Sequence, residues 1–175
     1  MPRLRLRLPA KHYVKGAGFI AWQSRHMFYH VLLGLVWAWF LRERWGQFNW
    51  RWVTTAVVGS LLPDLDHFYY FVGYGRHDTY TRQIKNFLKS RQWRAVTVFI
   101  ANGHKYNTNL SYHNYYFMAM LFIFSLVSLL YEWEVGVILF GAMIIHYLFD
   151  IADDVITLGA INPNWKRWGR PRKRQ

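Results

Sequence analysis

Apolar segments recur along the chain between polar or aromatic turns, a pattern that predicts about four helices. Largely apolar runs cover residues 31–41, 53–62, 115–131 and 135–149. The run 115–131 is uncharged and close to the lower limit of the roughly 20 residues that a helix needs to cross a bilayer. The other runs are shorter, so their helices would cross with polar ends at the membrane–water interface. The predicted fold is all-α, a helical membrane protein with about four short transmembrane or membrane-embedded helices and basic cytoplasmic loops.

The segments between the apolar runs predict a helix break and a surface helix. Pro63 cannot continue the backbone hydrogen-bond ladder and disfavours helical geometry at Leu62, so a kink or helix end is expected there. Residues 75–112 are polar and basic, and the apolar positions between 84 and 100 predict an amphipathic helix under this basic face. Residues 102–111 are predicted to form a loop.

The chain is expected to form one main domain between two basic ends. Residues 1–16 alternate Arg with Leu, and Pro9 and Lys11 interrupt the apolar core that a secretory signal requires. This segment is interpreted as a basic N-terminal arm. A helical membrane-embedded domain at 17–160 and a basic C-terminal tail at 161–175 are predicted to follow it.

Charge and composition narrow the class of partner. The chain has a formal net charge of +13, with 53% hydrophobic and 20% aromatic residues, and its mean hydropathy is −0.04. An anionic membrane surface and nucleic acid would each explain this positive charge. The uncharged run 115–131 favours the membrane, so lipids with anionic headgroups are the predicted partner and nucleic acid is disfavoured. Because the chain has no Cys, any metal must be held by His and carboxylates.

The distribution of Lys and Arg predicts how the chain lies in the membrane. Positive residues gather in the N-terminal arm, in the 75–112 segment and in the C-terminal tail, whereas the 131–134 turn carries two Glu and no Lys or Arg. The positive-inside rule then places both termini in the cytoplasm, with four crossings of the cell inner (cytoplasmic) membrane. The basic 42–52 turn would face outward and violates this rule.

Acidic residues are scarce and concentrated. Five of the nine lie just past two apolar runs, namely Asp64, Asp66, Asp150, Asp153 and Asp154. A charge beside an apolar helix is costly, so such carboxylates are candidates for function, although an Asp at a helix end can also act simply as a cap. In an up-down bundle they fall at the same end as several imidazoles, those of His26, His30, His67, His113 and His146. His146 and Asp150 are four residues apart and therefore share one helix face.

Such a cluster is suited to binding a divalent metal. Helical bundles build two-metal carboxylate sites from neighbouring helices, and imidazole with carboxylate favours zinc, with manganese or iron as alternatives. One or two ions could activate water for hydrolysis of a phosphate ester. Asp64 and Asp153 are the candidates for the catalytic general base. A lone His on an apolar helix is more often structural, and this interpretation is favoured for His26.

Five short motifs also resemble a known family. They are Tyr29-His30 with Gly34, GSLLPDLDH from Gly59 to His67, GHK from Gly103 to Lys105, YHN from Tyr112 to Asn114, and HYLFD from His146 to Asp150. Their order resembles that of the membrane-bound, metal-dependent hydrolases of bacteria and archaea, whose best-known member is a damage-inducible inner-membrane protein. The resemblance implies distant similarity to zinc-dependent phospholipase C. It also implies a ligand role for His30, Asp64, Asp66, His67, His104, His113, His146 and Asp150.

The sequence therefore predicts a membrane-bound metal-dependent hydrolase that acts on a phosphate ester or phospholipid. Two other classes remain open. One is a non-catalytic membrane protein whose intramembrane Asp and His residues handle protons or another ion. The other is a basic helical protein that binds nucleic acid through its Arg, Lys and Trp residues.

Overall fold

A computed structural model of the protein describes residues 16–108 and 110–167, with the backbone alone for residues 16–25, 101, 102, 104, 106 and 107. Most of these residues are helical and none is in a strand, which confirms the all-α prediction. The α-helices are α1 (Gly16–Trp45), α2 (Trp50–Leu61), α3 (Leu65–Val72), α4 (Thr79–Lys89), α5 (Trp93–Asn107), α6 (Tyr115–Leu130) and α7 (Glu134–Leu158). Two 3₁₀ helices complete the set, η1 (Leu62–Asp64) and η2 (Pro163–Lys166).

The described residues divide into two compact units. The larger unit contains residues 26–66 and 110–167, and the smaller contains residues 16–25 and 67–108. The segment 17–160, which the sequence treats as one domain, thus contributes to both units. Most of the predicted basic arm and the end of the predicted tail lie outside the described residues.

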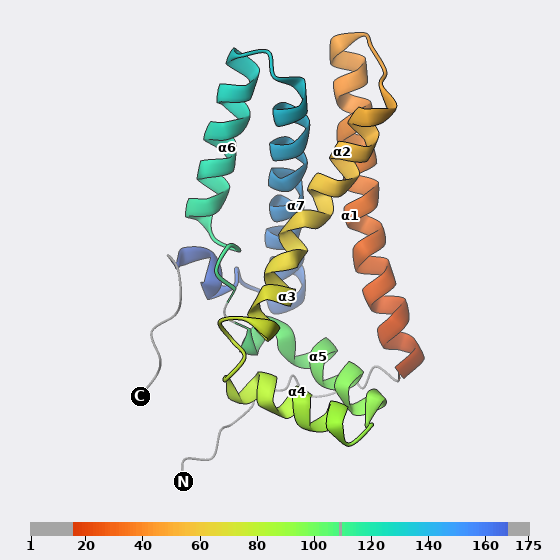
Figure 1. The fold of residues 1–175 in the computed structure, drawn as a ribbon, viewed down its shortest axis with the longest axis vertical. Helices are drawn as coiled ribbons and strands as arrows, with labels where there is room; N and C mark the ends of the chain where they lie inside the picture. The colour runs from red at the N-terminus through yellow and green to blue at the C-terminus, as the bar shows by residue number, and fades with distance from the viewer. Residues whose placement is uncertain (1–15, 109, 168–175) are drawn as a thin grey trace. The chain divides into compact units, whose positions relative to one another are not determined.

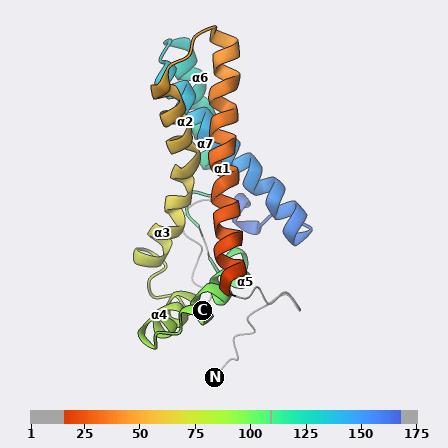
Figure 2. The same cartoon turned by 90° about the vertical axis from the view of Figure 1, so that its right-hand side faces the viewer.

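The larger unit is a bundle built around α7. This helix packs against α2 and α6, and α1 lies beside α2 in both Figure 1 and Figure 2. Short turns join α1 to α2 and α6 to α7, so successive helices run in opposite directions. The buried core joins α1, α2 and α7 through Ala38, Leu41, Trp52, Ala56, Val137, Ile138 and Ala142.

Small residues let the bundle helices approach closely. A Cβ added at Gly34 of α1 would lie 2.8 Å from the backbone oxygen of Ala56 and 2.8 Å from Oγ of Ser60. A Cβ at Gly59 of α2 would lie 2.9 Å from the backbone oxygen of Leu139 on α7. Glycine at such contacts is typical of helices that associate through close van der Waals packing.

The predicted break at Pro63 is confirmed in a specific form. The α-helix ends at Leu61, and a single 3₁₀ turn carrying Pro63 leads into α3. Leu62 keeps helical dihedral angles, φ −56° and ψ −40°, although the following proline disfavours them. The chain therefore tightens into a 3₁₀ turn instead of turning sharply away, and Asp64 closes that turn.

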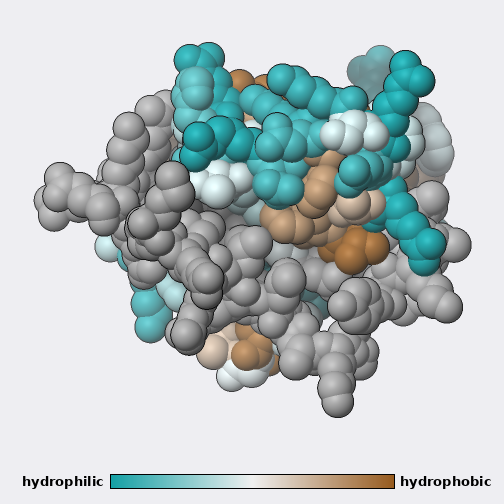
Figure 3. All heavy atoms as spheres, turned by 90° about the horizontal axis from the view of Figure 1, so that it is seen from below, coloured by the Kyte–Doolittle hydropathy of each residue, from teal (hydrophilic) through white to brown (hydrophobic). Residues whose placement is uncertain are grey.

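In the smaller unit the amphipathic segment forms two helices, α4 and α5. Tyr80 and Ile84 of α4 are buried, and the hydroxyl of Tyr80 donates to the backbone oxygen of Phe99 on α5 at 3.2 Å. Hydrophilic residues cover much of the described surface in the view of Figure 3, around a smaller apolar patch. The loop prediction is wrong for residues 102–107, which complete α5. The Asn and Gly residues there cost up to about 1 kcal/mol each in a helix, and the packing of α5 on α4 offsets this preference.

One described helix is long and apolar enough to cross a membrane. It is α7, with 25 residues and a mean hydropathy of 2.0 over its most apolar window. The apolar helix α6 has 16 residues, which corresponds to a length of about 24 Å. The arrangement with four crossings therefore remains a prediction.

Candidate metal centre

Imidazoles and carboxylates from four segments meet at one end of the larger unit. They come from the first half of α1, the turn after α2 together with the start of α3, the residue before the N-cap of α6, and the second half of α7. The side chains in mutual contact are His26, His30, Asp64, Asp66, His113, His146 and Asp150. The bundle thus brings together six of the eight ligands that the sequence suggests, and adds His26.

The most compact group consists of His30, His146 and Asp150. One potential ligand atom from each lies within 4.8 Å of the others. Nε2 of His146 is 3.0 Å from Oδ2 of Asp150, and Nε2 of His30 is 3.6 Å from Oδ1. Two ligands of a zinc ion, with bonds of about 2.0–2.2 Å, are roughly 3–3.5 Å apart in tetrahedral or octahedral geometry. The spacing of these atoms therefore fits an ion with little rearrangement.

A second group combines His26, His30 and Asp64. The two Nε2 atoms of His26 and His30 are 3.0 Å apart, and the His26 nitrogen lies 4.0 Å from Oδ1 of Asp150. Because His30 belongs to both groups, the residues could hold one ion or two neighbouring ions. Sequence reasoning favoured a structural role for His26. Its spacing of four from His30, which places both on one helix face, was the signal that could have identified it.

The proton on His146 can be assigned from its contacts. Nδ1 of His146 lies 2.6 Å from the backbone oxygen of Ser60, which can only accept a hydrogen bond, so Nδ1 donates. In the neutral ring Nε2 then carries a lone pair, and this nitrogen is buried and makes no hydrogen bond of ordinary geometry within the described residues. It faces the carboxylate of Asp150 at 3.0 Å. A positive charge, either a proton or a metal ion, is required between these two groups.

Asp66 and His113 form a pair beside Asp150. Oδ2 of Asp66 lies 3.2 Å from Nδ1 of His113 and accepts a hydrogen bond from the backbone N–H of Tyr112 at 2.8 Å. Nε2 of His113 lies 3.5 Å from Oδ2 of Asp150. Burial lowers the pKa of His113, but hydrogen bonds with Asp150 and Asp66 outweigh it and raise this pKa to about 9. Neither Asp66 nor His113 belongs to the two groups of potential ligands.

The two candidates for the general base lie in different surroundings. Burial raises the pKa of Asp64, and the nearby His146 opposes this shift only in part. The side chain of Asp64 is 28% exposed, and its Oδ1 is 4.0 Å from Nε2 of His146. Asp153 lies one turn beyond Asp150 on α7 and accepts a hydrogen bond from Thr157 at 3.2 Å. The ligand groups include Asp64 but not Asp153.

Two further residues belong to the predicted ligand set. His67 lies on α3 in the smaller unit and is in neither ligand group. His104 lies on α5, and its side chain is outside the described part of the chain. Asp154, the last of the five clustered acidic residues, is buried and accepts a hydrogen bond from Nε1 of Trp165 at 2.9 Å.

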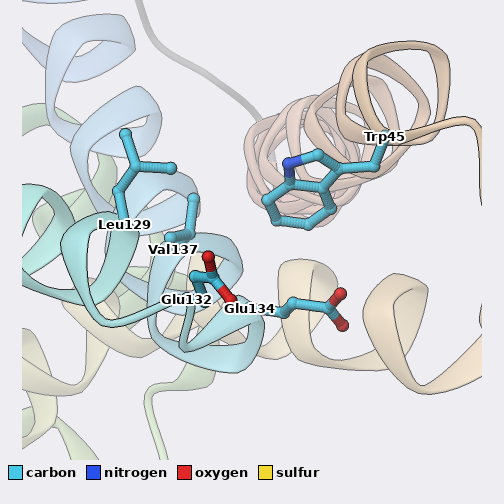
Figure 4. A pocket seen from close by; sticks show the side chains of 5 residues that line it. All are labelled: Trp45, Leu129, Glu132, Glu134 and Val137. Atoms are coloured by element: carbon cyan, nitrogen blue, oxygen red, sulfur yellow. The ribbon is translucent and has the colours of Figure 1, made fainter.

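A pocket of about 270 Å³ lies at the other end of the larger unit (Figure 4). It is lined by Trp45, Leu129, Glu132, Glu134 and Val137. None of the candidate metal ligands contributes to it, so it is separate from the imidazole–carboxylate cluster.

The chain matches no protein-family model, and no curated protein or solved structure is significantly similar to it. The resemblance to the membrane-bound hydrolases therefore rests on the five motifs alone. The geometry of the cluster is independent of that resemblance, and its chemistry can be argued from the residues themselves.

Proposed function

We propose that the protein is a membrane-embedded, metal-dependent hydrolase that acts on a phosphate ester, with phospholipids as one candidate class. The observation that carries this proposal is the distance of 3.0 Å between the buried Nε2 of His146 and Oδ2 of Asp150, two atoms that require a positive charge between them. Nitrogen and carboxylate donors without thiolate suit zinc, and also manganese or iron. One ion held by His30, His146 and Asp150 would supply the missing positive charge.

The residues of the cluster would have different chemical roles. A bound divalent ion supplies a water ligand whose pKa is close to neutrality. His30, His146 and Asp150 would hold that ion, and the buried imidazoles would exclude bulk water from it. Asp64 combines partial exposure with a pKa that burial raises above its ordinary value, which makes it the preferred general base.

Exposed apolar faces of the bundle support insertion into a membrane. Water-soluble proteins rarely leave large contiguous apolar patches uncovered. On α1 the exposed side chains include Leu32, Leu35, Val36, Trp39 and Phe40, and on α6 they include Phe122, Ile123, Leu126, Leu129 and Leu130. We propose that lipid tails cover these faces in the inner membrane, with four crossings and both termini in the cytoplasm. The short helix α6 would then require polar residues at the interface or local thinning of the bilayer.

Basic side chains of the smaller unit support contact with anionic headgroups. Arg82, Lys85 and Lys89 are exposed on α4, on the face away from the buried Tyr80 and Ile84. Each basic residue close to an anionic membrane surface contributes about 1 kcal/mol of attraction. We propose that this face binds anionic lipids.

Metal analysis of the purified full-length protein in detergent tests the proposal. After zinc loading and removal of excess ion, the wild type is expected to retain about one or two equivalents, whereas His146→Ala should retain almost none. His77→Ala serves as the matched control, because His77 is exposed and its imidazole contacts the neighbouring Arg76. A wild-type protein that retains no metal would contradict the metal centre.

Three further measurements distinguish the proposed hydrolase from the alternatives. The loaded protein is assayed against phosphomonoesters, phosphodiesters and phospholipids, and hydrolysis that depends on His146 is expected. Ion or proton flux in proteoliposomes without hydrolysis of any ester would favour the non-catalytic alternative. Carbonate extraction of membranes should leave the protein in the pellet, and its release would contradict insertion of the bundle.

A further inference from the structure

Two buried residues beside the proposed centre contact each other, and one of them contacts a proposed ligand. Asp66 and His113 are 4% and 5% exposed, and Oδ2 of Asp66 lies 3.2 Å from Nδ1 of His113. The other ring nitrogen of His113 lies 3.5 Å from Oδ2 of Asp150. This is the same carboxylate oxygen that lies 3.0 Å from Nε2 of His146. The contacts therefore form a chain that runs from Asp66 through His113 to Asp150.

The loop before α6 holds this chain rigidly. Oδ1 of Asn114 caps α6 by accepting from the backbone N–H of Phe117 at 2.8 Å, and its Nδ2 donates to the backbone oxygen of Ser111 at 2.6 Å. The imidazole of His113 packs edge-on against Tyr147 and Trp165, with ring centroids 5.1 and 6.0 Å away. The backbone N–H of Tyr112 also holds Asp66.

We propose that Asp66 and His113 are a positioning pair that fixes the carboxylate of Asp150 and that neither residue binds the ion. This inference rests on the proposed metal centre. Both ring nitrogens of His113 face carboxylates, and both residues lie outside the groups of mutually close ligand atoms. Partners that orient ligands in this way typically account for a 10- to 100-fold difference in metal affinity.

The test measures zinc affinity and the visible spectrum of the cobalt(II)-substituted protein for conservative variants. Asp66→Asn keeps an acceptor for Tyr112 N–H and for His113. His113→Gln keeps a donor that can reach Asp150, whereas His113→Leu removes it. We expect Asp66→Asn and His113→Gln to keep the wild-type stoichiometry and cobalt spectrum while they bind zinc roughly 10- to 100-fold more weakly. His113→Leu should bind more weakly than His113→Gln.

The outcomes that would overturn this inference differ from the outcome that would contradict the proposed function. An altered cobalt spectrum in His113→Gln, or the loss of one bound equivalent of zinc, would show that His113 is a ligand and would overturn the inference. Wild-type affinity in both Asp66→Asn and His113→Leu would overturn it as well. If the His113→Leu protein does not fold, the zinc affinity and cobalt spectrum of His113→Gln, compared with those of the wild type, still test the inference. A wild-type protein that binds no metal would instead contradict the proposed function, and His77→Gln controls for loss of an exposed imidazole.

Discussion

Nδ1 of His146 on α7 donates a hydrogen bond to the backbone oxygen of Ser60 on α2 at 2.6 Å. Both residues are fully buried. The bond joins the last helix of the bundle to the turn that precedes Asp64, and it leaves Nε2 of the same ring facing the cluster. One imidazole therefore contributes both to the packing of two helices and to the candidate metal centre.

These two roles of His146 can be separated by substitution. His146→Asn retains a donor near the position of Nδ1, whereas His146→Ala removes it and leaves a cavity. We expect both variants to lose bound zinc, and only His146→Ala to lose a further roughly 1–3 kcal/mol of unfolding free energy. Thermal unfolding of the metal-free proteins measures that difference. Equal stability of the two metal-free variants would contradict a packing role for the bond.

Zinc is expected to stabilise the folded protein through the same cluster. A ligand at 100 times its dissociation constant adds about 2.7 kcal/mol to the unfolding free energy. The wild type should therefore melt at a higher temperature with zinc than with a chelator, and His146→Ala should show no such difference. Melting curves with and without chelator provide the comparison.

Asp64 and Asp153 can be distinguished as general bases by matched amide variants. Asp64 lies within reach of the cluster, whereas Asp153 bonds to Thr157 one turn away. At saturating zinc, Asp64→Asn should reduce hydrolysis by about 100-fold or more, and Asp153→Asn should stay near the wild-type rate. Rates of phosphate-ester hydrolysis measured across pH give the result. A larger loss for Asp153→Asn would reverse the assignment.

Substitution of Gly34 tests the close packing of α1 on α2. An added Cβ there would lie 2.8 Å from both the Ala56 oxygen and Oγ of Ser60. Gly34→Val should therefore lower the unfolding free energy by about 1–3 kcal/mol or more, because these helices must separate. Ala119 on α6 is exposed, and Ala119→Val is the control with a similar increase in volume. Comparable melting temperatures for the two variants would contradict the tight contact.

The surroundings of Tyr70 predict that the stability of the smaller unit falls at alkaline pH. Burial, followed by the hydrogen bond that its hydroxyl donates to Asp78 at 2.8 Å, raises the pKa of Tyr70 above its ordinary value of 10.0. A raised pKa keeps the proton in the folded state, so this stabilisation is complete below about pH 10 and is lost as pH rises further. Unfolding free energies between pH 8 and 11.5 should fall less steeply for Tyr70→Phe than for the wild type. If the unfolding free energies of the two proteins change in parallel with pH, the raised pKa of Tyr70 is contradicted.

Local features of the sequence were enough to predict much of the bundle. The apolar runs 115–131 and 135–149 correspond to α6 and to most of α7. The spacing of His146 and Asp150 predicted a shared face, and their atoms lie 3.0 Å apart. Pro63 marked a break because the ring removes a backbone donor whatever the tertiary context.

Features that depend on tertiary contacts were harder to predict from the sequence. The spacing of four between His26 and His30 places both on one helix face, but that this face meets the cluster depends on the packing of α1 beside the other bundle helices. Asp66 and His67 are adjacent in the GSLLPDLDH motif, but consecutive helical residues point about 100° apart, so a shared role does not follow from adjacency. The division of 17–160 into two units likewise arises from packing between segments far apart in the chain.

The stacked rings of His30 and His146, with centroids 3.8 Å apart, also constrain when the centre can form during biosynthesis. One ring is on α1, and the other is on α7, which is synthesised later. The rings can meet only after α7 has left the ribosome and packed against the earlier helices. Metal acquisition is therefore expected to be a late step that follows assembly of the whole bundle.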